Sequence, residues 1–162
     1  MGTSVTISAA GERDAEQILK LQYLCFQSEA ARYGDYGIAP LTETQEEFRA
    51  QLARTTVLVA RLGEEIVGAV RASLDEDGTV SVGRLIVHPR LQRHGLGGRL
   101  LAGVEQRLAE SGARRYRLVT GGRSEGNQRL YRRYGYTPAG TERDRDVVLL
   151  TMVKDAAEPA GV

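Results

Sequence analysis

The chain has 162 residues, a formal net charge of +1 at pH 7, and 41% hydrophobic and 27% charged residues. Its length fits one domain with a single core, and its composition is that of an ordinary globular protein. The small net charge favours neither nucleic acid nor an anionic membrane as a partner. One cysteine excludes an internal disulfide, no Cys/His group has metal-ligand spacing, and no stretch approaches the roughly 20 apolar residues that cross a bilayer. We therefore expect a cytoplasmic protein without a metal centre.

The N-terminal segment predicts a strand followed by a helix. Residues 5–9 have the β-branched pattern of a short strand. From Asp14 onward, apolar residues including Ile18, Leu21 and Cys25 recur at helical spacing. Because Cys25 lies on this apolar face, we expect a buried structural thiol rather than a nucleophile.

The next segment predicts a loop and a second, shorter helix. Glycines and a proline interrupt any regular pattern in Arg32-Tyr-Gly-Asp-Tyr-Gly-Ile-Ala-Pro40, and its tyrosines are unusual for a plain linker. Thr44 and Glu47 have the spacing of a capping box, and Phe48 and Leu52 then share one helix face. We expect a functional loop that leads into a capped helix.

Three apolar or β-branched runs follow, at residues 55–62, 66–72 and 79–87. Turns that contain glycine and acidic residues separate the runs, so they predict an antiparallel meander. A helix is predicted from Gly98, with leucine and valine at core-facing positions. It ends at Gly112, a residue suited to a left-handed C-cap.

The C-terminal part predicts further strands around one helix. Residues 116–120 form a strand, Ser124 caps the helix that follows, and residues 147–153 form an apolar closing strand, which leaves one or two strands after this helix. This order predicts an α/β sandwich with a mixed sheet. We expect a single domain over residues 1–154 and a flexible C-terminal tail over residues 155–162.

A glycine-rich turn joins a strand to the helix after it. The apolar run at residues 85–87 stops before Pro89, which removes a ladder donor and opens the sheet edge. Three glycines lie within residues 93–98, where the backbone N–H groups of a helical first turn have no intrahelical acceptor. Such a turn is a ready binding site for a phosphate or pyrophosphate group.

Other phosphate-binding turns do not match this segment. A P-loop needs a Gly-Lys-Ser/Thr ending, which is absent, and a dinucleotide fingerprint needs a third glycine where Leu100 stands. A turn without any ligand stays open as the alternative. However, glycines that open a helix cost conformational entropy that packing alone seldom requires.

Three segments together carry a resemblance to a known family. Gln92-Arg-His-Gly-Leu-Gly97 matches Gln/Arg-x-x-Gly-x-Gly/Ala, the signature of the GNAT acetyltransferase superfamily. Arg84-Leu-Ile-Val-His-Pro89 resembles that family's fourth strand, and Leu130-Tyr-Arg-Arg-Tyr-Gly-Tyr136 resembles its Leu-Tyr-x-x-x-Gly-Phe helix end. The resemblance covers nearly the whole chain. It implies the GNAT-type α/β acyl-CoA N-acyltransferase fold, a mostly antiparallel sheet of six to seven strands splayed between strands four and five, with about four helices on its two faces.

The resemblance also implies a site for acetyl-CoA as co-substrate. The pantetheine arm would lie along residues 85–87, the amides of residues 93–98 would hold the pyrophosphate, and Asn127 would contact the pantetheine amides or the acetyl group. Arg90, Arg93, Arg99 or Arg132 would neutralise further phosphate charge. The implied cofactor-binding residues are Leu85, Ile86, Val87, Gln92, Arg93, His94, Gly95, Leu96, Gly97, Gly98, Arg99 and Asn127.

Tyr131 matches the position of the family's general-acid tyrosine, which protonates the leaving thiolate. The general base cannot be carried over, because Ser81 stands where several relatives have glutamate. His88, Glu29, Asp35 and a chain of water molecules are the open alternatives for this role.

The same resemblance assigns the acceptor cleft to a loop from Glu29 to Pro40 and to residues 136–145. Glu29, Tyr33, Asp35 and Tyr36 would suit a small cationic amine, through carboxylate and cation–π contacts. We expect direct acetyl transfer to a primary amine of a small molecule. N-acetylation of a protein or peptide, and acyl-CoA sensing without catalysis, stay open as alternatives. Relatives often form homodimers, and the sequence does not decide the oligomeric state.

Overall fold

The structure is a computed structural model that describes residues 4–34, 37–145 and 147–156. Its helices and strands in chain order are β1 (Val5–Ala9), α1 (Ala15–Tyr33), α2 (Ala39–Thr42), α3 (Gln45–Leu52), β2 (Thr56–Leu62), β3 (Glu65–Leu74), β4 (Thr79–Val87), α4 (Leu96–Ala109), β5 (Arg115–Gly121), α5 (Glu125–Arg133), β6 (Thr137–Asp144) and β7 (Val147–Asp155). Short 3₁₀ turns precede α1 and α4.

The strands are connected in the order β1-β2-β3-β4-β5-β7-β6. The β4–β5 pair is parallel, whereas the β1–β2, β2–β3, β5–β7 and β6–β7 pairs are antiparallel. This arrangement confirms the predicted α/β fold with a mixed, mostly antiparallel sheet. The contacts within the chain define two units, Met1–Ala72 with Arg84–Val104 and Ser73–Gly83 with Glu105–Val162.

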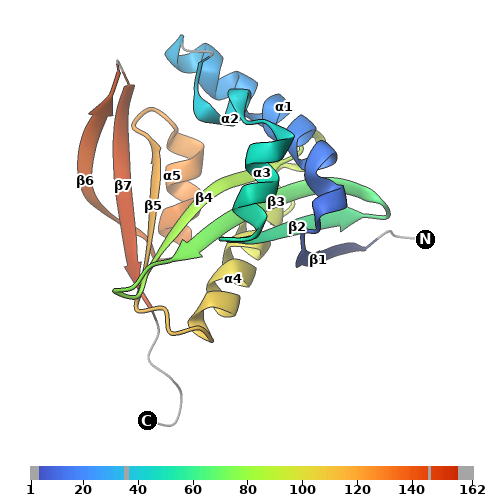
Figure 1. The fold of residues 1–162 in the computed structure, drawn as a ribbon. Helices are drawn as coiled ribbons and strands as arrows, with labels where there is room; N and C mark the ends of the chain where they lie inside the picture. The colour runs from blue at the N-terminus through green and yellow to red at the C-terminus, as the bar shows by residue number, and fades with distance from the viewer. Residues whose placement is uncertain (1–3, 35–36, 146, 157–162) are drawn as a thin grey trace. The chain divides into compact units, whose positions relative to one another are not determined.

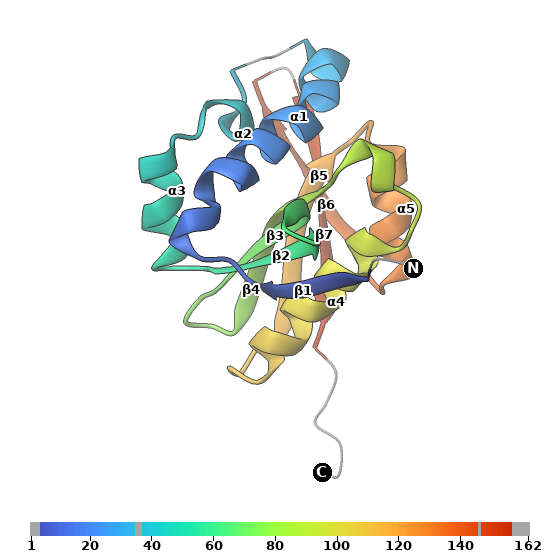
Figure 2. The same ribbon diagram turned by 90° about the vertical axis from the view of Figure 1, so that its right-hand side faces the viewer.

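In the first unit, α1 and α3 cover one face of strands β2 and β3, and the start of α4 covers the other (Figure 1). Side chains alternate between these faces along β2. Val57 and Val59 belong to a buried cluster with Phe48 of α3. Leu58 faces α4, where a Cβ atom built on Gly103 would lie 3.4 Å from Leu58 Cδ1. Figure 2 shows the same layers from the side of β1.

Helix α4 approaches the sheet closely at Gly68 of β3. A Cβ atom at Gly68 would lie 2.9 Å from Leu100 Cδ1 and 3.1 Å from the carbonyl oxygen of Ile86. A larger residue would therefore push α4 or β4 out of place. This contact fixes the start of α4 relative to the end of β4, the two elements that the glycine-rich turn connects.

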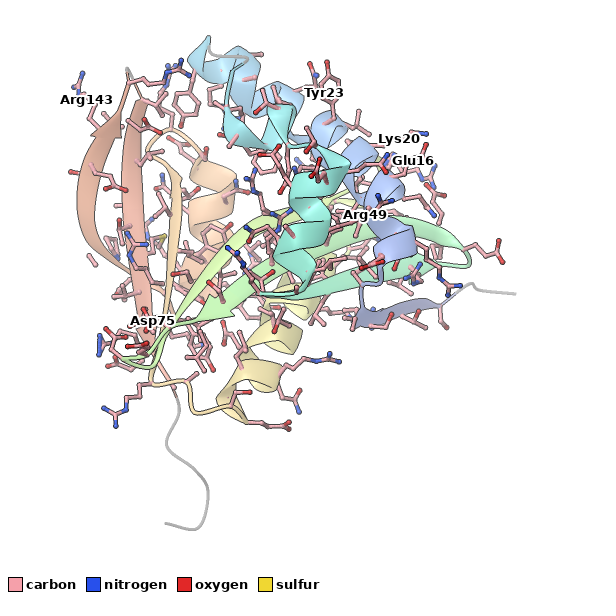
Figure 3. The ribbon with its side chains drawn as sticks, viewed as in Figure 1. Glu16, Lys20, Tyr23, Arg49, Asp75 and Arg143 are labelled. Carbon is pink, nitrogen blue, oxygen red and sulfur yellow. The ribbon has the colours of Figure 1, made fainter. Side chains whose placement is uncertain are left out.

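The outer face of α1 is solvated. Glu16 and Lys20 form an ion pair of 3.0 Å there, and Tyr23 is 55% exposed. These side chains extend outward from the helix in Figure 3. The predicted apolar face of α1 is its inner face, on which Ile18 and Leu21 are buried.

In the second unit, β7 lies between β5 and β6, and α5 packs beside them (Figure 1). Glu105 of α4 is the polar centre of this unit. It accepts a hydrogen bond from the buried Tyr136 hydroxyl at 2.9 Å and pairs with Lys154 at 2.7 Å. Burial, and then the negative charge of Glu105, raise the pKa of Tyr136 above its ordinary value of 10.

Several element boundaries differ from the sequence-based expectation. Helix α1 runs on to Tyr33 and ends at the left-handed Gly34, and Pro40 lies in the first turn of α2, so the predicted loop at residues 32–40 is shorter. Pro is well tolerated there because its missing N–H would have no helical acceptor. Helix α4 begins at Leu96, which is buried, rather than at Gly98.

Two further expectations are corrected near the C-terminus. Ser124 occupies the N-cap position of α5, but its side chain makes no capping hydrogen bond. Asp155 belongs to β7, and the Ala156 amide donates to the Arg114 carbonyl oxygen at 2.9 Å, so these two residues are not part of a frayed tail. The rest of that predicted tail lies outside the described residues.

A buried ion pair makes the stability of the first unit sensitive to pH. Asp14 Oδ2 accepts from Arg61 at 2.6 Å and from the Gly11 amide at 2.8 Å. Burial alone would raise the pKa of Asp14, but these hydrogen bonds outweigh it and hold the pKa below the ordinary 3.8. The unfolded chain therefore binds this proton more readily than the folded protein.

We expect the free energy of unfolding to decrease as the pH falls below about 4, through the native pKa of Asp14. Asp14→Asn should lower it by about 1 kcal/mol at pH 7 and flatten its dependence on pH in this range. Urea unfolding between pH 7 and pH 3 measures both effects. Glu12→Gln is the matched control, since Glu12 is exposed. Parallel pH curves for Asp14→Asn and the native chain would contradict this account.

Candidate functional site

The end of β4 offers backbone groups on one edge. The His88 amide donates to the Val67 carbonyl oxygen at 2.8 Å, which orients this position towards β3. Because backbone groups alternate along a strand, the N–H and C=O groups of Leu85 and Val87 point away from β3. Pairing between β4 and β5 covers Thr79–Val82 and stops there, although β4 continues to Val87.

Two side chains contact the Val87 carbonyl oxygen. Cys25 Sγ and Gln92 Nε2 each donate to it, at 3.4 Å. Burial raises the pKa of Cys25 to about 11, so its thiol is neutral at physiological pH and acts as a donor. Cys25 is half-buried against the core rather than fully buried, and its thiol contacts the backbone. Gln92, predicted to bind the cofactor, turns its side chain back to the strand and holds the turn in position.

The turn before α4 presents a row of amides. Arg93 and Gly95 both have left-handed backbones, with φ of 71° and 78°. The first helical hydrogen bond runs from the Arg99 amide to the Gly95 carbonyl oxygen, at 3.1 Å. The amides of residues 95–98 therefore precede the helical ladder and have no acceptor within the helix. Together with the positive end of the helix dipole, they form an arrangement that binds an anion.

The basic residues near this turn have different roles. Arg90 forms an ion pair with Glu65, and an Nη atom of Arg99 donates to the Val5 carbonyl oxygen at 3.3 Å. These two arginines, expected to add charge at a phosphate, thus already contact other parts of the first unit. Arg93 lies on the turn itself and is exposed.

His88 has a local structural role. Its Nδ1 accepts a hydrogen bond from the Arg90 amide at 3.2 Å and so caps the 3₁₀ turn that follows β4. The neutral ring must then carry its proton on Nε2, and Nδ1 is occupied. This geometry weakens the case for His88 as the general base.

In the second unit, Tyr131 is buried near the end of α5, with 8% of its surface exposed. Its ring meets that of Tyr136 edge to face, with centroids 6.1 Å apart and an interplanar angle of 62°. The Tyr136 amide donates to the Tyr131 carbonyl oxygen at 3.0 Å, and Gly135 has a φ of 97°. The Leu130–Tyr136 motif is therefore a helix end closed by a left-handed glycine, as its sequence indicates.

Residues at the start of α5 differ in exposure and contacts. Asn127, the predicted cofactor contact, is exposed. The neighbouring Gln128 Nε2 donates to the carbonyl oxygens of Gly121 and Gly122, at 3.0 and 3.1 Å, and so joins α5 to the end of β5. The sequence carried no signal for this contact.

The predicted acceptor residues divide into two groups. Glu29 and Tyr33 lie in the last two turns of α1, within a helix rather than a loop, and Glu29 Oε1 pairs with Arg32 at 3.1 Å. Asp35 and Tyr36 lie outside the described residues.

One polar cluster of the first unit was missed from the sequence. Gln22 of α1, Glu43 before α3, and Arg71 of β3 form a hydrogen-bonded group, with Arg84 of β4 close enough to act on it electrostatically. Burial alone would raise the pKa of Glu43, but hydrogen bonds from Arg71 and Gln22 outweigh it and lower the pKa below 4.5. Its members are far apart in the sequence, so no local motif could have revealed it.

The mixed sheet, with an amide-lined turn between β4 and α4, is an α/β fold with a candidate anion-binding turn. A model of the Acetyltransferase (GNAT) family matches residues 15–136, well over half of the chain. The chain therefore belongs to the GNAT acetyltransferase family. No curated protein matches it significantly.

Solved structures of acetyltransferases share this fold. The PaiA N-acetyltransferase from Thermoplasma acidophilum in complex with coenzyme A has 16% identity and a TM-score of 0.80, over 94% of this chain and 99% of its own. The ribosomal-protein-S18-alanine N-acetyltransferase from Escherichia coli has 16% identity and a TM-score of 0.78, over 98% and 97%. A probable acetyltransferase from Staphylococcus epidermidis has 10% identity and a TM-score of 0.81, over 95% and 100%. Within the described residues, no helix has the length and apolarity needed to cross a membrane.

Proposed function

We propose that this protein transfers the acetyl group of acetyl-CoA to the primary amine of a small molecule in the cytoplasm. The observation that carries this proposal is the turn before α4, whose amides at residues 95–98 have no helical acceptor and suit the pyrophosphate of coenzyme A. The complex of the Thermoplasma PaiA enzyme with coenzyme A supports the choice of cofactor.

The pantetheine arm would extend the sheet at β4. Leu85 and Val87 point their backbone groups away from β3, in the orientation that an added strand-like ligand needs. Gln92 and Cys25 hold the Val87 carbonyl oxygen, and so keep this edge in place. The remaining predicted cofactor residues, Ile86 and Asn127 among them, are kept in this proposal as the family resemblance assigns them.

In this chemistry the nitrogen loses two protons, one before it attacks and one after the N–C bond forms, and the leaving thiolate gains one. The amine nitrogen attacks the thioester carbonyl carbon, an N–C bond forms, the C–S bond breaks, and the thiolate of coenzyme A leaves. In this proposal Tyr131 donates a proton to the thiolate. A primary amine with a pKa of about 10.4 also has to lose a proton near pH 7, a cost of roughly 4 kcal/mol. With Ser81 at the position of the family glutamate and His88 Nδ1 occupied, we assign this step to a chain of water molecules.

A second candidate is N-acetylation of a protein or peptide. The fold shared with the Escherichia coli ribosomal-protein-S18-alanine enzyme supports this alternative. A third candidate, an acyl-CoA sensor without catalysis, is favoured by Ser81 and opposed by the buried Tyr131. A homodimer would be compatible with any of the three.

Isothermal titration calorimetry with acetyl-CoA tests the proposal first. We expect one binding site per chain, and no association would reject it at its root. Release of free thiol in the presence of amines then separates the candidates. Turnover with small amines supports the first, turnover with peptides alone supports the second, and slow hydrolysis without acceptor dependence supports the third.

A further inference from the structure

Arg84 of β4 places an unsatisfied guanidinium nitrogen inside the first unit. Its Nη1 atom is buried and has no hydrogen-bond partner among the described residues. A buried donor without an acceptor destabilises a fold, and a charged one does so more strongly. Buried polar groups without a hydrogen-bond partner are rare in folded proteins. A bound ligand that supplies the missing acceptor would explain this one.

The neighbouring carboxylate does not neutralise Arg84, because Arg71 occupies it. Arg71 donates to both carboxylate oxygens of Glu43, at 2.8 and 2.9 Å, and its guanidinium lies 5.2 Å from the centre of the Phe48 ring. Gln22 adds a third hydrogen bond to Glu43, at 2.9 Å. The Glu43 side chain is only 8% exposed, and the Arg71 side chain 12%. Arg71 and Glu43 thus form a bidentate pair, and the carboxylate accepts three hydrogen bonds in all.

The charges of the cluster therefore do not cancel. Two guanidinium groups, of Arg71 and Arg84, face one carboxylate, of Glu43, which leaves one positive charge in excess. Burial lowers the pKa of Arg84, and repulsion from the positive charge of Arg71 lowers it further. A ligand with a single negative charge would balance the cluster and satisfy Nη1. Arg84 as a whole is half-buried, whereas its Nη1 atom is buried, so an anion that binds Nη1 must enter the cluster.

The backbone at Arg84 is also unusual. Its φ is 52°, a left-handed conformation in the middle of a strand that a residue other than glycine rarely adopts. Strain of this kind, of order 1–3 kcal/mol, is concentrated at sites where function fixes the position of a side chain. Arg84 immediately precedes Leu85, the first residue of the segment to which we assign pantetheine.

We propose that Arg84 binds a carboxylate of the acceptor, so that the substrates are small amines that also carry a carboxylate group, such as amino acids. This inference rests on the transfer to a primary amine proposed above and narrows its substrate class. A planar guanidinium fork matches a carboxylate in shape and in charge. An acceptor with a carboxylate group replaces the small cationic amine expected from the sequence. Glu29, which was predicted to bind that cation, already pairs with Arg32.

Matched acceptors test the carboxylate directly. Glycine, leucine and lysine are each compared with the corresponding carboxamide, and phosphoethanolamine with ethanolamine, by release of free thiol from acetyl-CoA. We expect kcat/KM for each amino acid to exceed that of its carboxamide at least tenfold. Equal use of acids and amides would overturn the proposal. A preference for phosphoethanolamine over every amino acid would also overturn it, since the site would then select a phosphate.

The variant Arg84→Gln identifies the residue responsible. It should lower kcat/KM for the amino acids at least tenfold, mainly through KM, while the carboxamides and the affinity for acetyl-CoA change less than twofold. Arg49→Gln is the matched control, because Arg49 is exposed on α3, where Figure 3 shows it. A loss of kcat/KM of equal size for acids and amides would overturn the proposal. Arg84 would then act at the reacting thioester or stabilise the fold, instead of binding the carboxylate.

A thermal unfolding experiment separates a binding role from a structural one. With the unmet charge removed, Arg84→Met should have a midpoint equal to or above that of the native chain, and a lower midpoint would overturn the proposal. Millimolar leucine, added with coenzyme A, should raise the midpoint of the native chain but not that of Arg84→Gln. Absence of this shift would reject the carboxylate site even if no acceptor turns over. Failure of the proposed function is separate, since it would appear as absence of acetyl-CoA binding in calorimetry.

Discussion

Replacement of Tyr131 by phenylalanine is expected to lower kcat at least tenfold while leaving the affinity for acetyl-CoA unchanged. The ring is buried and packs edge to face on Tyr136, and phenylalanine keeps these contacts. The variant removes only the hydroxyl, which in our proposal protonates the leaving thiolate. Loss of a positioned general acid typically reduces rates 10²–10⁴-fold, and water can supply part of the lost proton transfer.

Steady-state kinetics with calorimetry on the same preparations would measure both quantities. Tyr134→Phe is the matched control, because Tyr134 lies one turn further along, at the C-cap of α5, and we assign it no catalytic role. A Tyr131→Phe enzyme with native kcat would remove Tyr131 from the mechanism. Weaker acetyl-CoA binding with native kcat would instead assign the hydroxyl to the cofactor.

The second large effect is expected at the glycine-rich turn. Gly97→Glu should raise the Kd for acetyl-CoA about a hundredfold, which corresponds to about 2.8 kcal/mol. Gly97 lies in the first turn of α4, among the amides that precede the helical ladder. A side chain there would occupy the space of the pyrophosphate, and its carboxylate would repel the phosphate charges from a helix end that otherwise attracts them.

Ala102→Glu on the same helix provides the control for added charge. Ala102 is exposed and lies one and a half turns beyond the site. Ala102→Glu should therefore change the Kd for acetyl-CoA less than twofold. Circular dichroism should show native helix content in both variants, because glutamate is favourable in a helix. Native affinity in Gly97→Glu would show that the diphosphate does not bind at this helix end.

Local sequence patterns were sufficient for much of the fold and for the turn. The Thr44–Glu47 capping box is present, with hydrogen bonds of 2.9 and 3.1 Å, because both partners lie within one helical turn. The strands at β2, β3 and β4 follow from their β-branched runs, and the left-handed Gly112 follows from its place after an amphipathic helix. In each case the residues that determine the local structure lie within a few positions of it in the sequence.

Strand β6 was not predicted as a separate strand, since the sequence left one or two strands open after α5. Its residues, Thr137–Asp144, include a proline, a glycine and five charged or polar side chains, and all of them are exposed. Nothing in such a segment alternates between apolar and polar. It becomes a strand because β7 offers a partner, and the pairing tolerates an irregularity between Pro138 and Gly140.

The Arg84 cluster shows the second limit of sequence interpretation. Gln22, Arg71 and Arg84 come from α1, β3 and β4, and Glu43 from the segment between α2 and α3, and each alone resembles an ordinary solvated polar residue. Only the three-dimensional structure reveals that Glu43 accepts hydrogen bonds from Arg71, while Nη1 of Arg84 has no hydrogen-bond partner among the described residues. Specificity for an acceptor depends on such long-range contacts, whereas the cofactor turn is encoded in consecutive residues.

The half-buried thiol of Cys25 has a practical consequence for assays of this enzyme. With a pKa of about 11, it is ionised in only about one molecule in ten thousand at pH 7. Disulfide reagents that detect coenzyme A by its free sulfhydryl react with the ionised form. Since the chain has no other cysteine, the native protein should add almost no background colour, and unfolding should expose one reactive equivalent per chain.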